Sequence, residues 1–206
     1  MNITYRIEFT SYWHIGSGLS GGTDVDALVL KDKNGFPYIP GKTLKGLLRD
    51  AAETLLSVNA TGFTKDWINQ LFGTSDDEVK EDKNKKEKIF KREPGKLYFT
   101  NARLTQKLQL EIEKESTLPF LFETIASIRI NSKTGTTKKQ SLREMEVCVP
   151  LTLFAQILDV PNEEDHKSLK QCLNMVKRMG VNRNRGLGRC QLSITEIKQE
   201  EVNHEN

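Results

Sequence analysis

The sequence lacks the signals of a membrane protein and of a disulfide-stabilised protein. No run approaches the roughly 18 consecutive apolar residues that a membrane-spanning helix needs, and the opening MNITYRIEFT lacks the charged-then-apolar order of a signal peptide. Only three cysteines occur, Cys148, Cys172 and Cys190, and they form no Cys-x-x-Cys pair. We therefore expect a cytoplasmic protein with three buried thiols rather than a structural zinc site.

The chain also has little net charge. Its 206 residues include 31 lysines and arginines against 28 aspartates and glutamates, which leaves a formal net charge of +3. Bulk charge therefore does not indicate a nucleic-acid partner, and any such function must come from where the basic residues lie. The length is sufficient for a domain with its own hydrophobic core.

Local patterns predict alternating strands and helices. Apolar and polar residues alternate over 3–9, as in a half-buried strand, and apolar residues at three- and four-residue spacing predict a helix over 42–56. The order strand, helix, strand, strand, helix, strand predicts an α+β fold of the ferredoxin-like type. The remaining predicted elements are a strand at 27–30, a short helix over 67–72 ending at Gly73, a strand at 97–99, a strand at 145–153 with an edge or bulge at Pro150, a helix from an Asn162 cap to a Gly180 stop, and a strand at 190–194.

Two segments differ in composition from the rest. Residues 76–93 carry seven acidic and seven basic residues with almost nothing apolar, which predicts a solvated, mobile insertion. Residues 125–143 contain five basic residues and no acidic one, and Gly135 among threonines and serines predicts a hairpin or an extended loop. Because no internal repeat or clean linker divides the chain, we expect one domain over 1–198 and a frayed tail over 199–206.

The stretch GVNRNRGLGRC, residues 180–190, is rich in both glycine and arginine. A glycine-rich loop can present successive backbone N–H groups to phosphate oxygens, and neighbouring arginines add charge-assisted hydrogen bonds. One hypothesis is therefore a cradle for a phosphodiester backbone. The alternative is a tight helix-to-strand turn whose arginines are simply solvated, and spacing alone does not decide between them.

Four segments could combine into one nucleic-acid site. These are the glycine-rich loop 14–24, the basic start of the helix 42–56, the basic segment 125–143 and the loop 180–190. All are loops or helix ends, and a ferredoxin-like sheet can bring several of them to one side as a continuous positive track. Four independent solvated patches are the alternative.

Several motifs carry a family resemblance. They are HIGSG, an aspartate before an apolar strand, GFPYIPGKTLKGLLR, FGTS and NRNRGLGR. In this combination the sequence resembles the RAMP superfamily of CRISPR-associated RNA-binding proteins, and within it the guide-RNA-binding backbone subunit of type III effector complexes. The resemblance covers residues 3–49, 71–75 and 180–194 well and the middle of the chain poorly.

The resemblance implies a modified RNA-recognition-motif-like fold with inserted loops. It implies that 125–143 is a protruding thumb-like hairpin that kinks the duplex of guide and target RNA, with Ile128 and Ile130 as apolar wedges. The implied partners are guide RNA, single-stranded target RNA and other effector subunits, including copies or homologues of this chain that stack head to tail. The implied RNA-binding residues are His14, Gly16, Ser17, Lys42, Thr43, Lys45, Arg49, Arg129, Lys133, Arg183, Asn184, Arg185 and Arg189.

Some proteins of this kind cut target RNA by metal-dependent attack of a ribose 2′-hydroxyl on the adjacent phosphate, using an aspartate in the loop before the second strand. Of Asp24 and Asp26, Asp26 matches better because it directly precedes the apolar ALVL run. A lone carboxylate could recruit a divalent cation, expected to be Mg²⁺, only if RNA oxygens complete the coordination. The alternative is that both aspartates merely solvate or cap the loop.

His14 has more than one possible role. Repeat-processing nucleases of the same superfamily often use a histidine as a general acid or base, but a histidine at a strand end can also contact RNA or form structural hydrogen bonds. We expect a contact rather than catalysis. The competing functions are thus a guide-bound endoribonuclease subunit, a non-catalytic scaffold, a stand-alone repeat-processing endoribonuclease and a protein-interaction module that never binds RNA.

Overall fold

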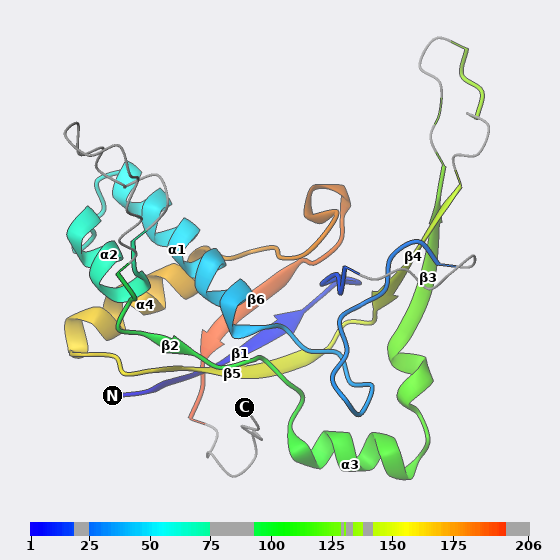
Figure 1. Cartoon of the computed structure of the whole chain (residues 1–206), viewed down its shortest axis with the longest axis horizontal. Helices are drawn as coiled ribbons and strands as arrows, with labels where there is room; N and C mark the ends of the chain where they lie inside the picture. Colours follow the sequence, from blue (N-terminus) through cyan, green and yellow to red (C-terminus); the bar gives the residue numbers. More distant parts are fainter. Residues whose placement is uncertain (19–24, 75–92, 129, 131–133, 138–141, 197–206) are drawn as a thin grey trace, which may run out of the picture.

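The computed structural model describes residues 1–18, 25–74, 93–128, 130, 134–137 and 142–196. Its larger sheet is antiparallel, and the helices α1 (Gly41–Ser57), α2 (Lys65–Phe72) and α4 (Glu163–Met175) lie together on one side of it (Figure 1). With the inserted elements set aside, the chain order β1–α1–β2–β5–α4–β6 is the ferredoxin-like order, and the predicted α+β class is confirmed. Across the sheet the strands follow the order β2 (Tyr98–Phe99), β5 (Thr152–Leu158), β1 (Ile3–Phe9) and β6 (Cys190–Ile194).

One face of this sheet is buried beneath α1 (Gly41–Ser57) and α4 (Glu163–Met175). Every second side chain of β1 is apolar and buried, whereas Arg6 and Glu8 between them are exposed. Helix α1 packs beside α4, and α4 packs on β6. The two-residue period of the strands and the helical period of the covering elements therefore meet in one core.

The predicted cap of α4 is confirmed. The Asn162 side chain accepts the backbone N–H of Asp165 at 2.8 Å, and the first turn is acidic, which the helix dipole favours. The Asp165 carboxylate in turn accepts the indole N–H of Trp67 at 2.6 Å. This bond joins α4 to α2 (Lys65–Phe72), the predicted short helix, which ends at Gly73 as expected.

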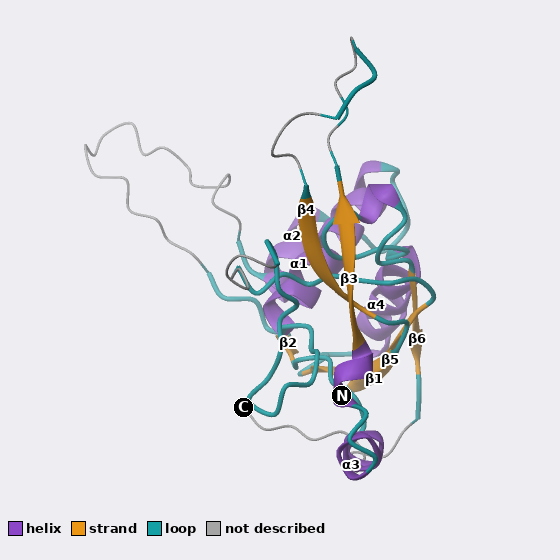
Figure 2. Cartoon of the chain, turned by 90° about the vertical axis from the view of Figure 1, so that its right-hand side faces the viewer, coloured by secondary structure: helices purple, strands orange, loops and turns teal. Residues whose placement is uncertain are grey.

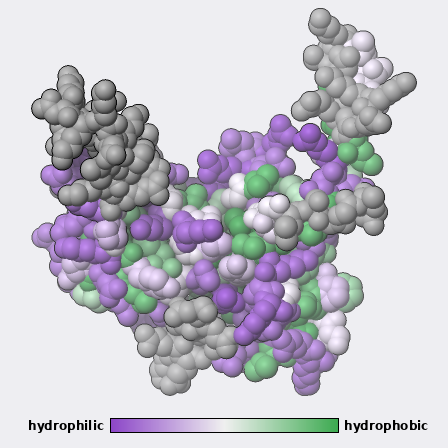
Figure 3. All heavy atoms as spheres, in the orientation of Figure 1, coloured by the Kyte–Doolittle hydropathy of each residue, from purple (hydrophilic) through white to green (hydrophobic). Residues whose placement is uncertain are grey.

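A two-stranded ribbon projects from this body in two perpendicular views (Figures 1 and 2). Strand β3 (Phe122–Ser127) pairs antiparallel with β4 (Arg143–Cys148), so the predicted hairpin is confirmed. Beyond the paired strands, the side chains of Ile128 and Ile130 are 55% and 60% exposed. Hydrophobic atoms are visible on the stem of the ribbon (Figure 3).

The predicted strand at 27–30 is wrong. Ala27 forms one backbone bridge to Met145, and Val29 forms one to Gly16. The segment runs between two different partners, so neither offers it a continuous ladder. The run is apolar because Val29 is buried in the protein interior, not because the segment forms a strand.

The alternating run 145–153 is two strands rather than one. Strand β4 ends at Cys148 in the small sheet, and β5 begins at Thr152 in the large one. Pro150 lies between them and has no N–H to donate to a ladder. The chain changes sheets at this point, so the feature predicted as an edge or bulge is a break.

Helix α4 ends at Met175 rather than at Gly180. Residues 177–179 pair instead with 188–190, because Met179 N donates to Gly188 O and Cys190 N donates to Lys177 O, both at 3.0 Å. Val176 and Met179 are buried as their helical spacing predicted. The apolar period thus continues past the end of the helix.

Helix α3 (Gln106–Lys114) has no counterpart among the predicted elements. Its N-terminal cap is Thr105, whose side chain accepts the N–H of Leu108 at 3.4 Å. Ile112 is its one buried residue, and Leu108, one turn earlier, packs partly buried against the core. Within the described part of the chain, no helix combines the length and apolarity needed to cross a membrane.

The three cysteines are free and buried, as predicted. Burial raises the pKa of all three thiols, and it brings that of Cys172 to about 12. Residues 76–92 of the predicted insertion 76–93, and the predicted tail 199–206, lie outside the described residues.

Candidate nucleic-acid interface

The end of β1 joins the arginine-rich loop. Gly188 N donates to Tyr12 O at 2.7 Å, and Val181 N donates to His14 O at 2.9 Å. Thr10 N also donates to Arg189 O at 2.9 Å. Two of the four predicted segments, far apart in sequence, therefore lie against each other.

Two glycines make this close approach possible. A Cβ atom at Gly188 would lie 1.9 Å from the carbonyl oxygen of Met179, and one at Gly180 would lie 2.4 Å from that of His14. Both residues also have positive φ, +66° and +91°. Much of the glycine content that suggested a phosphate cradle is thus required for packing one backbone segment on another.

Strand β4 completes the junction. Trp13 and Cys148 exchange two backbone hydrogen bonds, at 3.0 and 2.8 Å. The His14 ring is 2% exposed, and its Nδ1 lies 2.6 Å from Glu146 O. His14 therefore links the β1 extension, β4 and the final loop. This is the structural hydrogen-bonding role, and the burial of the ring leaves little of it for an RNA contact.

Glu146 is a second link, and sequence reasoning did not single it out. Its carboxylate accepts the backbone N–H of Val29 at 2.9 Å and Lys31 Nζ at 2.7 Å. Lys31 Nζ also lies 3.8 Å from the centre of the Phe122 ring. Glu146 thereby holds the segment 25–31 against the base of the ribbon. No local pattern reveals this role, since its partners lie more than one hundred residues away.

Asp26 lies within this held segment. Its backbone N donates to Glu144 O at 2.9 Å, and its Oδ2 accepts the Glu144 N–H at 2.8 Å. The residue is exposed, so its carboxylate reaches solvent beside the ribbon, near the hairpin end of the paired strands. Asp24, the other candidate, lies outside the described residues.

The metal-binding capacity of this position is small. Among the described residues, no group of three or more histidine, cysteine, aspartate and glutamate side chains could hold a metal ion. Asp26 already uses Oδ2 to accept the Glu144 N–H. The donor set therefore fits a cation that takes one protein carboxylate and the rest of its ligands from a substrate.

The Gly16 and Ser17 backbones line the same junction. Gly16 pairs with Val29, and Ser17 N donates to Leu28 O at 3.0 Å. The Ser17 hydroxyl donates to the same Leu28 oxygen at 3.1 Å. Both residues thus help to fix the loop that carries Asp26.

The side chains of the final loop are exposed. Arg183, Asn184 and Arg185 form one short 3₁₀ turn, flanked by left-handed backbone at Asn182 and Gly186. Arg178 Nη1 donates to Arg183 O at 3.2 Å, and this hydrogen bond holds the turn against residue 178. The guanidinium groups of this loop are therefore presented to solvent from an ordered backbone.

The start of α1 is a separate region. Among the described residues, no hydrogen bond or ion pair joins it to the other segments, although Lys42, Thr43 and Lys45 are at least partly exposed. The Gly41 N–H, at the first turn of α1, donates to the Asn101 side chain at 2.9 Å. RNA binding by this helix start stays a prediction.

Arg49 has a structural role. Its guanidinium contacts Glu53 Oε1 and Gly73 O, both at 2.8 Å, and Asn69 Oδ1 at 3.4 Å. These bonds join α1 to the end of α2 and do not support the predicted phosphate contact. Arg129 and Lys133, predicted on the hairpin, lie outside the described residues.

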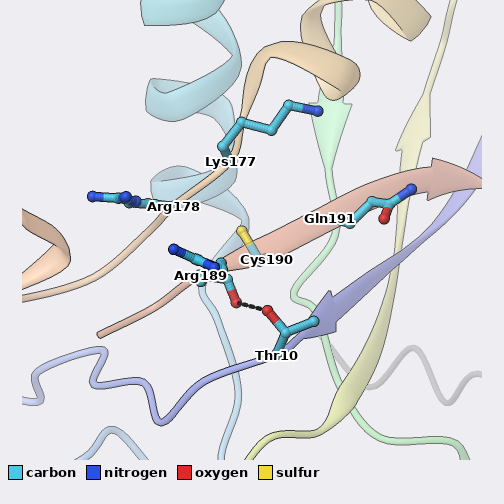
Figure 4. A pocket seen from close by; sticks show the side chains of 6 residues that line it. All are labelled: Thr10, Lys177, Arg178, Arg189, Cys190 and Gln191. Carbon is cyan, nitrogen blue, oxygen red and sulfur yellow. Dashed lines mark hydrogen bonds between the residues drawn. The ribbon is translucent and has the colours of Figure 1, made fainter. Parts of the chain in front are cut away.

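A cationic pocket flanks the loop. It has a volume of about 340 Å³ (Figure 4). Lys177 and Arg178 belong to it and were missed, because they were assigned to the helix that in fact ends at Met175. The available signal was the adjacent basic pair just before the loop. The lining residues are Thr10, Lys177, Arg178, Arg189, Cys190 and Gln191.

The described residues form an antiparallel α+β fold with glycine-bearing loops and exposed arginines beside a projecting ribbon. The family model described as the RAMP superfamily matches residues 6–191, and the chain belongs to that superfamily. No curated protein matches the sequence.

Solved structures share the fold. A chain of the type III-B Cmr-beta complex bound to cognate target RNA, determined by cryo-electron microscopy, has a TM-score of 0.68 and 12% sequence identity. The similarity covers 94% of this chain and 97% of that one. A chain from the apo state of Cmr-beta has a TM-score of 0.63 and 14% identity, covering 95% and 98%.

Proposed function

We propose that this chain is an RNA-binding subunit of a type III CRISPR effector complex that holds guide RNA and cleaves complementary target RNA. Its superfamily membership and its structural similarity to chains of the Cmr-beta complex support this function. Other effector subunits, including copies or homologues of the chain, are the proposed protein partners. The final loop, with Arg183 and Arg185, contacts guide phosphates in this proposal.

The observation that carries the cleavage half is the position of Asp26. Its carboxylate is exposed beside the ribbon, near the hairpin end of the paired strands, and is fixed there by hydrogen bonds to Glu144. If the ribbon parts the guide–target duplex, a target phosphate beside the ribbon at Glu144 lies within reach of this carboxylate. One charged group held against a rigid strand is what positioning of a reacting hydroxyl requires.

The reaction is attack of a ribose 2′-oxygen on the adjacent phosphorus. The bond from phosphorus to the 5′-oxygen breaks, and the leaving oxygen takes a proton from water. This leaves a 2′,3′-cyclic phosphate on one fragment and a 5′-hydroxyl on the other. Asp26 orients the 2′-hydroxyl or accepts its proton. A divalent cation, proposed to be Mg²⁺, would offset the charge that develops on the phosphate oxygens when bound beside Asp26.

The test is Asp26→Asn in the assembled effector complex. The amide keeps an oxygen that can accept the Glu144 N–H, so the local fold survives while the charge is lost. We expect target cleavage to slow by about 100-fold or more, the usual contribution of a general base, with guide binding unchanged. The matched control is Asp50→Asn, which removes an exposed carboxylate from α1.

Cleavage at the wild-type rate by Asp26→Asn would refute the enzymatic half and leave the RNA-binding scaffold as the function. Failure of the complex to retain guide RNA at all would refute both halves.

The stand-alone nuclease is disfavoured by a specific observation. The His14 ring, its best acid or base, is buried against Glu146 O.

A further inference from the structure

One edge of the ribbon is unpaired. In β4, Cys148 exchanges backbone hydrogen bonds with the extension of β1, and the Glu146 N–H donates to the Ala27 oxygen. The even-numbered residues of β4 thus point away from β3, and its odd-numbered residues form the ladder to the odd-numbered residues of β3. The backbone groups of Thr124 and Ala126 therefore point outward. Within the described part of the chain, no hydrogen bond reaches them.

The sequence of β3 does not protect this edge. Phe122–Ser127 contains neither proline nor lysine, the residues that commonly keep an exposed strand from pairing. Figure 2 shows the strand running along the stem of the ribbon, and its six residues are long enough for a regular ladder. An edge of this kind is a template for one more strand.

Apolar side chains flank both ends of the edge. Phe120, just before β3, is 77% exposed, and Ile128, just after it, is 55% exposed. Ile125, at the centre of the strand, is partly exposed. A strand that docks along β3 and covers these side chains removes apolar surface from water, which favours its association.

The edge is complementary to itself. Two copies of β3 can pair antiparallel about a two-fold axis at Ile125, so that Thr124 of each copy lies opposite Ala126 of the other. Because both residues point outward, each such pair exchanges two backbone hydrogen bonds, and the two pairs give about four. The same register places Phe122 of one copy opposite Ile128 of the other.

The apolar pattern selects this register among the alternatives. With the axis at Ile125, that side chain lies opposite its own copy, and apolar residues meet at both ends of the ladder. A shift of two residues in either direction would place Ile125 opposite Glu123 or Ser127 instead. Cross-strand contacts between apolar side chains stabilise a sheet, so the shifted registers are less favourable.

The charges also fit this register. Glu123 of one copy lies opposite Ser127 of the other, and Ser127 pairs with Arg143 on its own ribbon. Glu123 and Arg143 of different copies thus share one face of the sheet, two strands apart, at about 9–10 Å between Cα atoms. Both residues are exposed, and their long side chains can span that separation. No like charges meet across the new edge.

We infer that the outer edge of β3 is a docking surface for a second copy of this chain, whose own β3 pairs with it antiparallel. The two ribbons then form one continuous sheet. The contact is small, so we expect a weak dimer with a Kd of the order of 10 μM. This inference goes beyond the proposed function, because the pairing needs no RNA.

The test is cysteine cross-linking of the purified full-length chain without RNA, using oxidised glutathione. Opposed residues of a non-hydrogen-bonded pair have Cα atoms about 4.5 Å apart, a separation that a disulfide can bridge. Ile125→Cys should therefore give at least about 10-fold more covalent dimer than the wild type. The native cysteines are buried, so the wild type measures the background.

Matched variants test the register. Glu123→Cys and Ser127→Cys should each remain at the background when alone, because each position lies more than about 13 Å from its equivalent in the second copy. An equimolar mixture of these two variants should cross-link, because the two positions face each other. Equal cross-linking of the separate variants and the mixture would show random collision and would overturn the pairing.

A second pair of variants tests the edge itself by sedimentation velocity over about 1–100 μM protein, a range that brackets the expected Kd. Ala126→Pro removes an outward N–H that the ladder to β4 does not use, and it should weaken the dimer by at least about 10-fold. Arg143→Glu should also weaken it, and adding Glu123→Arg should restore it. Circular dichroism and thermal melting of each variant establish that the fold is retained.

Two results would overturn the inference. One is a wild-type chain that stays monomeric throughout this range while Ile125→Cys cross-links no more than the wild type. The other is a monomeric chain whose entry into an effector complex is blocked by Ala126→Pro, since the edge then pairs with a different subunit. Loss of RNA binding would refute the proposed function and leave the self-pairing intact, so the two failures are distinguishable.

Discussion

The junction at Glu146 should dominate the stability of the loop that carries Asp26. Its carboxylate accepts two donors from one segment, the Val29 N–H at 2.9 Å and Lys31 Nζ at 2.7 Å. In Glu146→Gln only one oxygen remains. The new amide NH₂ must face one of the two donors, so one hydrogen bond is replaced by a contact between donors.

The cost can be worked from burial. The Glu146 side chain is 14% exposed and that of Lys31 is 33% exposed, so solvent only partly screens the pair. Losing a hydrogen bond to a charged group costs about 1.5–3 kcal/mol, and leaving a buried donor without an acceptor adds to this. We expect Glu146→Gln to reduce the free energy of unfolding by about 2–4 kcal/mol.

An exposed ion pair supplies the matched comparison. Arg6 Nη2 lies 3.8 Å from Glu8 Oε2, and the two side chains are 49% and 48% exposed. Such a pair contributes about 0–1 kcal/mol, so Glu8→Gln should change the free energy of unfolding by less than about 1 kcal/mol. The contrast separates the effect of burial from that of removing a carboxylate.

Urea unfolding followed by circular dichroism measures both variants, and a double-mutant cycle with Lys31→Met isolates the pair. A coupling of about 1–3 kcal/mol between Glu146 and Lys31 is expected. If Glu146→Gln costs no more than Glu8→Gln, or if the coupling is zero, Glu146 does not hold the loop and the reasoning is refuted.

Two further predictions concern backbone packing and burial. Gly188→Ala should destabilise the protein by more than about 2 kcal/mol, because it combines a positive φ with a Cβ that would lie 1.9 Å from Met179 O. Gly46→Ala in α1, where a Cβ meets nothing within 4 Å, should stabilise the protein by about 0.5–1 kcal/mol. Equal urea midpoints for the two variants would contradict this. Burial raises the pKa of the Cys172 and Cys190 thiols to about 12 from 9.0, so their contribution to stability is full below pH 9 and is lost as pH rises toward 12, because the unfolded chain ionises first. Urea unfolding between pH 8 and 11 measures this loss, which should be smaller in Cys172→Ala with Cys190→Ala because only the buried Cys148 thiol then contributes. An undiminished loss would show another cause.

The sequence determined the elements whose signals are local. Alternation of apolar residues predicted β1 and β6, helical spacing predicted α1, and Asn162 marked the start of α4. These signals suffice because periodicity and capping depend on residues within a few positions of one another. The superfamily was likewise recognisable from short motifs in the first and last parts of the chain.

Tertiary structure decided the features whose partners are distant. Whether the apolar run at 27–30 forms a strand depends on Met145 and Gly16, and the early end of α4 depends on pairing with residues 188–190. His14 acquires its role from the backbone oxygen of Glu146, 132 positions away in sequence. Glu146 acquires its role from Val29 and Lys31, which are more than one hundred positions away. A local pattern records which face of an element is apolar, but it does not specify which backbone atoms will meet that element. The folded chain alone brings the loop of Asp26, the ribbon and the arginine-rich turn to one junction.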